Sequence, residues 1–557
     1  MSYRAKQILC IAILFVLLLS PIIYAFFTAI DLEYSWFKRI AYLAIVILLL
    51  LLPATFLKAR TYFIIEGIFN YFFFPIEIAS LYLNHQSAST AFLENILHTD
   101  IHESLELLLS MWPLCLVVVA LWVIYFVITS LTENQYLLRP VWRHIVLIGI
   151  PVTVVAGVFA MIFFLMQVHN ERSARDTISD AVGLVWMKLY KIYPYNLYVE
   201  SWDIICAVQR QQRLQKLVKD FSFDINPHPN NTPALYVLVI GETARFDNFG
   251  INGYKRNTTP NLSCETNLIS YDSAFSQANL TSFSVPLILT RATAANSEIA
   301  YCEKSLPEAF QEACYRASFI TKQMPSGLIQ RIMSACDDSY FYAKGIDVAD
   351  NYDEEMIGKM AEMKKDSLQF FVLHSLGCHF RYELRYPASF AHFQPTFGHS
   401  FSYSMISEEN KDLLINAYDN AILYTDYFLS EIIHYLDSLN IPSVMLYMSD
   451  HGESFWDDER KLSLHGSYKI SEYEYHVPLL VWYSDEYKTR YPEKVQAMWK
   501  NKTTPVSSDV VFYSMLDLAG IEAVVDSTRS ICSPYLVPID SVRVFDGTGA
   551  VQTLVIH

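Results

Sequence analysis

The stretch SVMLYMSDHGES, Ser443–Ser454, is an apolar run that stops abruptly at an aspartate and a histidine. Three other stretches contain similar apolar runs. They are ALYVLVIGE (Ala234–Glu242), LQFFVLHSLGCH (Leu368–His379) and VPLLVWYS (Val477–Ser484). Runs of this kind, separated by segments with helical patterning, indicate strands that are buried on both faces of a sheet and covered by helices. The sequence therefore predicts an α/β domain with a central sheet over residues 231–557.

Polar side chains follow these runs at the points where the predicted strands end. Glu242 follows the first run, and Asp450 and His451 follow the third. Functional groups of such sheets gather beyond the carboxyl ends of the strands. Carboxylate and imidazole ligands without thiolate suit Zn²⁺ or Mn²⁺, so we expect a divalent metal site there. We interpret the adjacent Gly241 and Gly452 as residues that let the backbone turn sharply.

The N-terminal third has a different composition. The chain has 557 residues, of which 53% are hydrophobic, and its mean hydropathy is above zero, which is unusual for a wholly soluble protein. A helix needs about 20 apolar residues to cross a bilayer. Runs of about this length lie at Ile8–Phe27, Ile40–Leu57, Tyr62–Leu83, Trp112–Leu131 and Ile145–Met166. We therefore expect a multi-pass transmembrane domain with five helices over residues 1–168.

The distribution of basic residues predicts the orientation of these helices, because cytoplasmic loops collect Lys and Arg. Basic residues precede the first run and lie in the second-to-third and fourth-to-fifth connections, whereas Asn84–Met111 has none and is acidic. Only Lys38 and Arg39 in the first-to-second connection dilute this pattern. The N-terminus is therefore expected in the cytoplasm, and an odd number of spans puts the C-terminal domain outside it.

Residues 169–230 join the two predicted domains. Aromatic and basic residues alternate there, which suits a bridging segment along the membrane interface, and a solvated connector is the alternative. The net charge of −16 argues against a nucleic-acid partner. Six cysteines lie beyond the predicted spans and bridge, and this even number is compatible with disulfides in an oxidising compartment. They are Cys264, Cys302, Cys314, Cys336, Cys378 and Cys532.

Six short motifs, taken in order and spacing, resemble the membrane-bound phosphoethanolamine transferases of Gram-negative bacteria, within the alkaline phosphatase and sulfatase superfamily. They are GETAR (Gly241–Arg245), TSFSVP (Thr281–Pro286), HSLGCH (His374–His379), NAYDN (Asn416–Asn420), SDHGES (Ser449–Ser454) and LHG (Leu464–Gly466). The resemblance covers nearly the whole chain to about residue 525. It implies a five-helix transmembrane domain followed by a sulfatase-like α/β domain.

The resemblance also implies a ligand set. Glu242, Asp450, His451 and the hydroxyl of Thr281 would bind the catalytic zinc, with Thr281 as the nucleophile. This role is chemically reasonable, since coordination to a divalent cation lowers the pKa of a hydroxyl group. Without the resemblance, Thr281 reads as an ordinary loop or cap residue, and the serines that follow it in TSFSVP are equal candidates.

Further residues match the family at lower specificity. His379 and His465 correspond to histidines that contact the transferred phosphate or a second zinc ion, and Gln323 resembles a group near the substrate. His374 fits a structural role. Glu453 fits either a partner that orients a metal ligand or a carboxylate at the start of a helix.

The acidic connection between the third and fourth runs contains another match. Asn95, Thr99 and Glu103 recur every four residues and would share one face of a helix. The family places polar groups that engage the headgroup of the donor lipid there. A helix with a merely solvated polar face is the alternative.

The resemblance implies an inner-membrane enzyme with a periplasmic catalytic domain. It would move phosphoethanolamine from phosphatidylethanolamine to a lipid A or lipopolysaccharide core acceptor through an ester on threonine, and so favour resistance to cationic peptides. Alternatives are a phosphoglycerol transferase, a phosphodiesterase and a non-catalytic membrane receptor. A sulfatase would need Cys/Ser-x-Pro-x-Arg, whereas Ser284–Ile288 reads SVPLI. The chain also departs from the family, because no cysteine pair flanks Thr281 and a tail follows from about Ile531.

Overall fold

The computed structural model describes most of the C-terminal two thirds of the chain and parts of the N-terminal third. The described residues are 2–28, 50–84, 112–138, 195–225, 232–342, 352–363, 366–398, 405–521 and 524–556, with single residues at 47, 88, 93, 96 and 193 and a few within 140–148. Two compact units result, one formed by Met1–Glu94 with Met111–Ala207 and the other by Asn95–Ser110 with Val208–His557.

The described part of the first unit is helical. It contains α1 (Tyr3–Thr28), α3 (Ala59–Asn84) and α6 (Trp112–Leu131), and α9 (Tyr195–Val218) follows in the chain. Within α1 and α3, Tyr3–Ser20 and Ala59–Leu81 are long and apolar enough to cross a membrane, and the apolar stretch of α6 is shorter. The predicted runs at 40–57 and 145–166 lie largely outside the described residues, so the five-helix domain stays a prediction.

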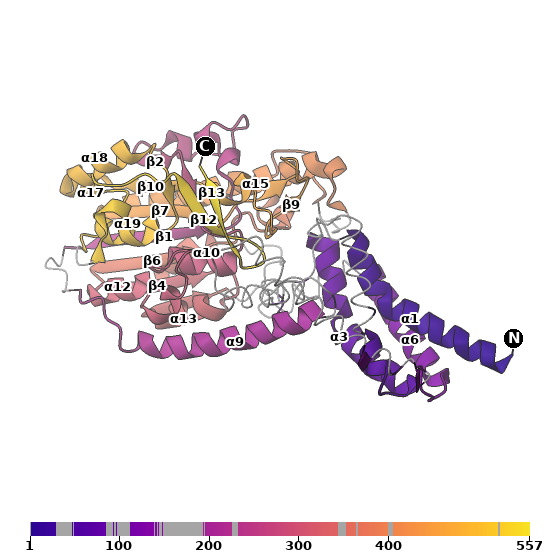
Figure 1. The fold of residues 1–557 in the computed structure, drawn as a ribbon. Coiled ribbons are helices and arrows are strands. Elements are labelled where there is room, and N and C mark those ends of the chain that lie inside the picture. The colour runs from indigo at the N-terminus through magenta and orange to yellow at the C-terminus, as the bar shows by residue number, and fades with distance from the viewer. Residues whose placement is uncertain are drawn as a thin grey trace, which may run out of the picture. The chain divides into compact units, whose positions relative to one another are not determined.

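The second unit is built on a mixed seven-stranded sheet with the order β2-β10-β7-β1-β6-β4-β5 (Figure 1). Its strands are β1 (Ala234–Gly241), β2 (Leu268–Tyr271), β4 (Arg316–Thr321), β5 (Asp338–Phe341), β6 (Leu368–His374), β7 (Ser443–Ser449) and β10 (Leu479–Tyr483). Only β10 runs antiparallel to its neighbours in this sheet. The predicted α/β domain is confirmed, and the four apolar runs are β1, β6, β7 and β10.

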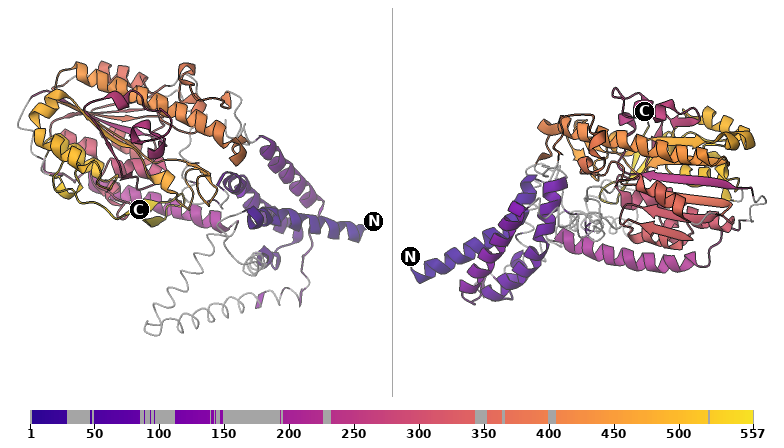
Figure 2. Two further views of the ribbon diagram at one scale, coloured as in Figure 1. Left: turned by 90° about the horizontal axis from the view of Figure 1, so that it is seen from above. Right: turned by 180° about the vertical axis from the view of Figure 1, so that it is seen from behind.

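Both faces of the sheet are covered, which explains the continuous apolar runs. Leu235, Val237 and Val239 of β1 pack in the cluster formed with α14 (Glu355–Glu362) and α15 (Lys411–Ser438). The alternate residues of β1 pack in the cluster on the opposite face, which includes α12 (Leu306–Glu312), α13 (Gly327–Ala335) and α19 (Val510–Leu518). Figure 2 shows α15, in orange, lying along one side of the sheet. Neither set of alternate positions therefore faces water.

Shorter elements surround the carboxyl ends of the central strands. Helix α10 (Thr281–Ile288) follows a loop, the pair β8 (Ser454–Phe455) and β9 (Ser463–Leu464) is antiparallel, and β12 (Ser541–Phe545) forms a C-terminal hairpin with β13 (Val551–Val555). The other α-helices and strands that the structure describes in this unit are α11 (Ile299–Cys302), α16 (Glu472–Tyr475), α17 (Asp485–Arg490), α18 (Pro492–Asn501), β3 (Ala274–Phe275) and β11 (Val506–Ser507), and short 3-10 helices lie between them.

All nine cysteines carry free thiols, so the disulfides with which the even number of cysteines is compatible do not form in this structure. The fold separates them. Cys378 packs in the hydrophobic cluster on the α15 face, whereas Cys532 packs in the cluster on the opposite face. A disulfide needs Cα atoms within about 7 Å, and the sheet between these two clusters prevents that approach.

Candidate metal centre

Strand register brings the predicted ligands together. Gly241 at the end of β1 pairs with Ser449 at the end of β7, so the residues that follow, Glu242 and Asp450, leave the sheet side by side. With His451 they form a buried cluster, called the metal-type cluster below, whose possible ligand atoms all lie within 4.8 Å of one another. The His451 Nε2 atom is 3.6 Å from Oε1 of Glu242 and 3.5 Å from Oδ2 of Asp450.

The two carboxylates are arranged as though to share a cation. Oδ2 of Asp450 is buried without a hydrogen-bond partner among the described residues, which is unfavourable for a carboxylate in a protein interior. Burial, together with the charge of Glu242, raises the pKa of Asp450 well above its usual range. A divalent cation would relieve both the desolvation and the repulsion.

His451 is prepared to act as a neutral ligand. Its Nδ1 atom lies 2.9 Å from the carbonyl oxygen of Gly452, and a hydrogen bond donated there leaves the Nε2 lone pair facing the carboxylates. Burial, and secondarily the neighbouring His465, lowers the pKa of His451 to about 3. The donor set of two carboxylates and one neutral imidazole fits zinc and leaves room for a further ligand.

The hydroxyl of Thr281 lies at this cluster. Thr281 is the first residue of α10, and its Oγ1 atom is 3.1 Å from Oε2 of Glu242 and 3.2 Å from Nε2 of His451. Ser284, one turn further along α10, is buried and donates instead to the backbone carbonyl of Asp450 at 2.6 Å. The geometry thus separates two hydroxyls that the sequence leaves equivalent.

Thr243 links the two carboxylates, although sequence reasoning assigned it no role. Its hydroxyl donates to Oε1 of Glu242 at 2.6 Å and its backbone N–H donates to Oδ1 of Asp450 at 3.1 Å. Both bonds depend on a left-handed backbone, with φ at 57°, which costs a β-branched residue about 1–3 kcal/mol. No sequence pattern reveals this conformation, because threonine rarely adopts it.

The interpretation of Gly241 and Gly452 as flexible turn residues is wrong. Neither residue has a positive φ angle. A Cβ atom on Gly241 would lie 2.3 Å from the hydroxyl oxygen of Tyr447, and one on Gly452 would lie 2.1 Å from the carbonyl oxygen of Tyr473. Both glycines are needed because other groups approach the backbone closely.

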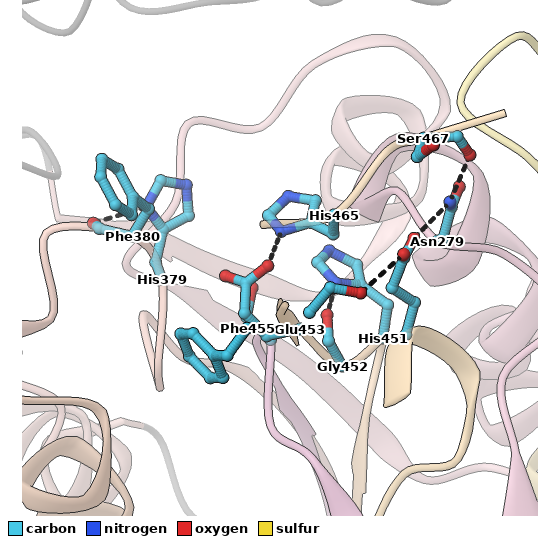
Figure 3. Close-up of polar contacts among 12 residues, drawn as sticks. Asn279, His379, Phe380, His451, Gly452, Glu453, Phe455, His465 and Ser467 are labelled. Atoms are coloured by element: carbon cyan, nitrogen blue, oxygen red, sulfur yellow. Dashed lines mark hydrogen bonds and ion pairs between the residues drawn. The ribbon is translucent and has the colours of Figure 1, made fainter. Parts of the chain in front are cut away.

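A second histidine, His465, lies beside the cluster, and its pKa is shifted in the opposite direction to that of His451. Nδ1 of His465 is 3.0 Å from Oε1 of the buried Glu453, whose other oxygen accepts a 2.8 Å hydrogen bond from Tyr382. Burial alone would lower the pKa of His465, but the Glu453 carboxylate outweighs it and the pKa is raised. The rings of His465 and His451 are 4.2 Å apart (Figure 3). Glu453 therefore orients a histidine, and it precedes strand β8 rather than a helix.

The remaining predicted residues differ in their placement. Gln323 donates from Nε2 to Oε2 of Glu242 and to the carbonyl oxygen of Ser375, both at 2.8 Å, so it holds a carboxylate of the cluster. His379 is half-buried, with Nδ1 3.2 Å from the carbonyl oxygen of Phe380. His374 is buried and its Nδ1 lies 3.2 Å from the Thr321 hydroxyl, and burial lowers its pKa to about 4.

The predicted donor-lipid residues Asn95, Thr99 and Glu103 lie outside the described residues. Their role stays a prediction. The roles of Glu242, Thr281, Asp450 and His451 as zinc ligands, and of His379, His465 and Gln323 toward substrate, are likewise proposals built on this geometry.

Comparison with protein-family models identifies the α/β unit. The model described as Sulfatase matches residues 234–521, more than half of the chain. The chain belongs to the sulfatase family. Within this family it resembles the phosphoethanolamine transferases, as the motifs predicted, and it lacks the arginine of the Cys/Ser-x-Pro-x-Arg motif.

Curated relatives carry the name phosphoethanolamine transferase. EptA of Salmonella typhimurium is 30% identical over 354 residues, covering 59% of this chain and 61% of that protein. EptC of Escherichia coli is 25% identical over 516 residues, covering 89% of this chain and 83% of that protein. The match to EptA of Helicobacter pylori spans 54% of that relative. The chain thus spans little more than half the length of the EptA relatives.

Solved structures share the fold. The integral membrane EptA from Neisseria meningitidis aligns with a TM-score of 0.66 at 19% identity, covering 84% of this chain and 86% of that one. The periplasmic domain of Escherichia coli EptC, solved as a complex with zinc, aligns with a TM-score of 0.53 at 22% identity, covering 59% of this chain and 94% of that domain. The sulfatase-like domain predicted from the sequence is confirmed.

Proposed function

We propose that this chain transfers phosphoethanolamine from phosphatidylethanolamine to a lipid A or lipopolysaccharide core acceptor through an ester on Thr281. The observation that carries the proposal is the position of the Thr281 hydroxyl, within 3.2 Å of both a carboxylate oxygen and the Nε2 atom of a buried metal-type cluster. The curated relatives support the donor group, and one of them is named Kdo(2)-lipid A phosphoethanolamine 7″-transferase.

Glu242, Asp450 and His451 would hold zinc beside Thr281. When bound, zinc would lower the pKa of the threonine hydroxyl and withdraw charge from the phosphoryl group. The orphaned Oδ2 atom of Asp450 and the neutral imidazole of His451 support this ligand set. His379 or His465 would alternatively serve a second zinc ion, and elemental analysis of the purified chain distinguishes one bound zinc ion from two.

In the first step the Thr281 oxygen attacks phosphorus, an O–P bond forms, and the bond from phosphorus to the diacylglycerol oxygen breaks. The hydroxyl proton leaves Thr281 and diacylglycerol departs with a proton on its oxygen, so atoms and charge balance. Thr281 lies at the N-terminus of α10, whose positive end favours the charge that develops there. His465, whose pKa the Glu453 carboxylate raises, would donate a hydrogen bond to a phosphoryl oxygen.

In the second step an acceptor hydroxyl or phosphate attacks the same phosphorus and Thr281 leaves with a proton. Buried Glu242 remains in place throughout, because Thr243 and Gln323 both donate to it. The sequence predicts an inner-membrane protein with its catalytic unit in the periplasm. In that arrangement both lipids would reach Thr281 by diffusion within the membrane.

Mass spectrometry of lipid A tests the proposal. A Gram-negative host that expresses the wild-type chain should gain a phosphoethanolamine group on lipid A or core sugars. Thr281→Ala should abolish the gain, and Thr281→Ser should keep part of it because a hydroxyl remains. An unmodified glycolipid beside released phosphoethanolamine would identify a phosphodiesterase instead, and added glycerol phosphate would identify the phosphoglycerol branch.

A further inference from the structure

The C-terminal hairpin lies outside the matched family region and meets the segment that carries Thr281. The Sulfatase match ends at residue 521, whereas β12 and β13 span Ser541–Val555. The last residue of β12, Phe545, donates its N–H to the carbonyl of Gln277 at 2.8 Å and accepts from the N–H of Asn279 at 3.2 Å. The hairpin therefore adds two backbone hydrogen bonds to the loop that leads into Thr281.

The same residue also packs on helix α10. The rings of Phe545 and Phe283 are stacked, with centroids 5.1 Å apart and planes 25° apart. Phe283 is two residues beyond Thr281 in the first turn of α10. The hairpin thus contacts the chain on both sides of Thr281, and an aromatic pair of this kind limits how far that turn can shift.

The turn of the hairpin contacts the loop that follows His465. Gly547 donates its N–H to the carbonyl of Ser467 at 3.2 Å, and a Cβ atom on Gly547 would lie 1.6 Å from the carbonyl oxygen of Gly466. Gln552 bridges the two parts, since its Nε2 donates to Oδ2 of Asp546 at 2.7 Å and to the carbonyl of Tyr468 at 2.5 Å. The hairpin and the His465 loop are therefore in backbone contact.

The loop that leads into Thr281 and the loop that follows His465 are also hydrogen-bonded directly to each other. Asn279, which is fully buried, donates from Nδ2 to the carbonyl of Ser467 at 3.0 Å and to Oε2 of Glu474 at 2.8 Å (Figure 3). No disulfide braces the Thr281 segment, because all nine cysteines are free. The connections between Thr281 and His465 that run through this region are consequently non-covalent.

We propose that the C-terminal hairpin, through Phe545 and Gly547, is a positioning element that holds Thr281 and His465 at a working distance from each other. The inference rests on the proposed function in taking Thr281 as the nucleophile. Neither hairpin residue touches the metal-type cluster in the described contacts, so both act through the loops they hold. A displacement of about 1 Å at a reacting group can lower its rate roughly a hundredfold.

Phe545→Ala in the full-length, detergent-solubilised chain tests this proposal, with Phe545→Tyr as the conservative variant. Phe545→Ala should lower kcat roughly ten- to a hundredfold while zinc content stays the same and the donor KM changes less than twofold. Phe545→Tyr keeps the ring and should restore most of kcat. Val555→Ser, on an exposed position of the same hairpin, is the matched control and should behave as wild type.

Hydrogen exchange gives a second readout that does not depend on the reaction. Backbone amides of residues 277–284 and 465–468 should exchange faster in Phe545→Ala and in Gly547→Ala, with or without metal, than in Val555→Ser. Unchanged exchange there, or a lower Tm with unchanged kcat at 25 °C, would overturn the proposal and leave the hairpin a purely stabilising element.

An artificial aryl phosphodiester separates this proposal from the proposed function. If the wild-type chain fails to use phosphatidylethanolamine but cleaves the aryl diester in a Thr281-dependent way, the donor assignment fails and the kcat comparison proceeds on the aryl substrate. If neither substrate reacts, the exchange comparison alone decides whether the hairpin holds the two loops.

Discussion

The metal-type cluster and the nucleophile segment are held by different means. Glu242 and Asp450 follow β1 and β7, two neighbouring strands paired over seven residues in parallel register, so their backbones are fixed by the sheet. Thr281 follows a loop that is held by side chains and by the distant C-terminal hairpin. The proposed metal ligands therefore depend on local strand pairing, whereas the proposed nucleophile depends on tertiary contacts that the loss of a single side chain can break.

Asp450→Asn should have the largest effect, because it removes the charge of a proposed metal ligand that strand β7 positions. We expect zinc to be lost and the transfer rate to fall roughly a thousandfold or more, since a catalytic metal contributes several kcal/mol to the transition state. The metal-free variant should also be more stable to urea than the metal-free wild type, because one of two repelling buried carboxylates is gone.

Elemental analysis and urea denaturation measure these two outcomes. Thr281→Ala is the matched comparison, since it should keep most of the zinc while abolishing transfer. Full zinc occupancy in Asp450→Asn would contradict the ligand assignment.

Glu453→Gln should have an intermediate effect, because it acts on His465, the histidine beside the cluster whose pKa is raised. The amide preserves the shape of the contacts with His465 and Tyr382 but removes the charge that raises the His465 pKa. We expect kcat to fall about ten- to a hundredfold with zinc retained. Steady-state kinetics with parallel zinc analysis measures this, and Glu459→Gln at an exposed position is the control. Equal kcat values in the two variants would exclude a role for the Glu453 charge.

Gln323→Ala should have the smallest effect of the three. It removes one 2.8 Å hydrogen bond to Glu242, whose two oxygens keep the hydrogen bonds from Thr281 and Thr243. A lost bond to a charged group is worth about 1.5–3 kcal/mol, and zinc ligation would offset part of it, so zinc affinity should fall roughly tenfold. A chelator titration measures the affinity. Gln330→Ala, exposed on α13, should leave it unchanged.

Much of the site could be anticipated because it follows from strand ends. Each apolar run ends where a buried strand leaves the sheet, and polar residues at that point must converge. The role of Thr281 could not be predicted from strand ends, because Thr281 does not follow one of the apolar runs. Its motif contains several hydroxyls, and only the packing of α10 turns Ser284 toward the Asp450 backbone and Thr281 toward the cluster.

Other features lay beyond the sequence because they depend on approach between distant segments. The glycines at 241 and 452 suggested turns, yet they make room for a tyrosine ring and a carbonyl group that come from elsewhere in the chain. The left-handed backbone of Thr243 is maintained by its bonds to both carboxylates and by Tyr418, whose hydroxyl donates to its carbonyl at 2.7 Å. The sheet likewise separates Cys378 from Cys532, which no local pattern shows.

The sequence by itself determined the α/β class of the C-terminal unit, its four central strands and the family resemblance. Hydrophobic patterning and short motifs are local properties, and a chain buries its apolar runs in few ways. Only the tertiary structure decided which hydroxyl meets the cluster, that Glu453 pairs with His465, and that residues near 545 contact the segment near 281. Contacts between positions hundreds of residues apart depend on side-chain packing and close backbone approach, which no local pattern encodes.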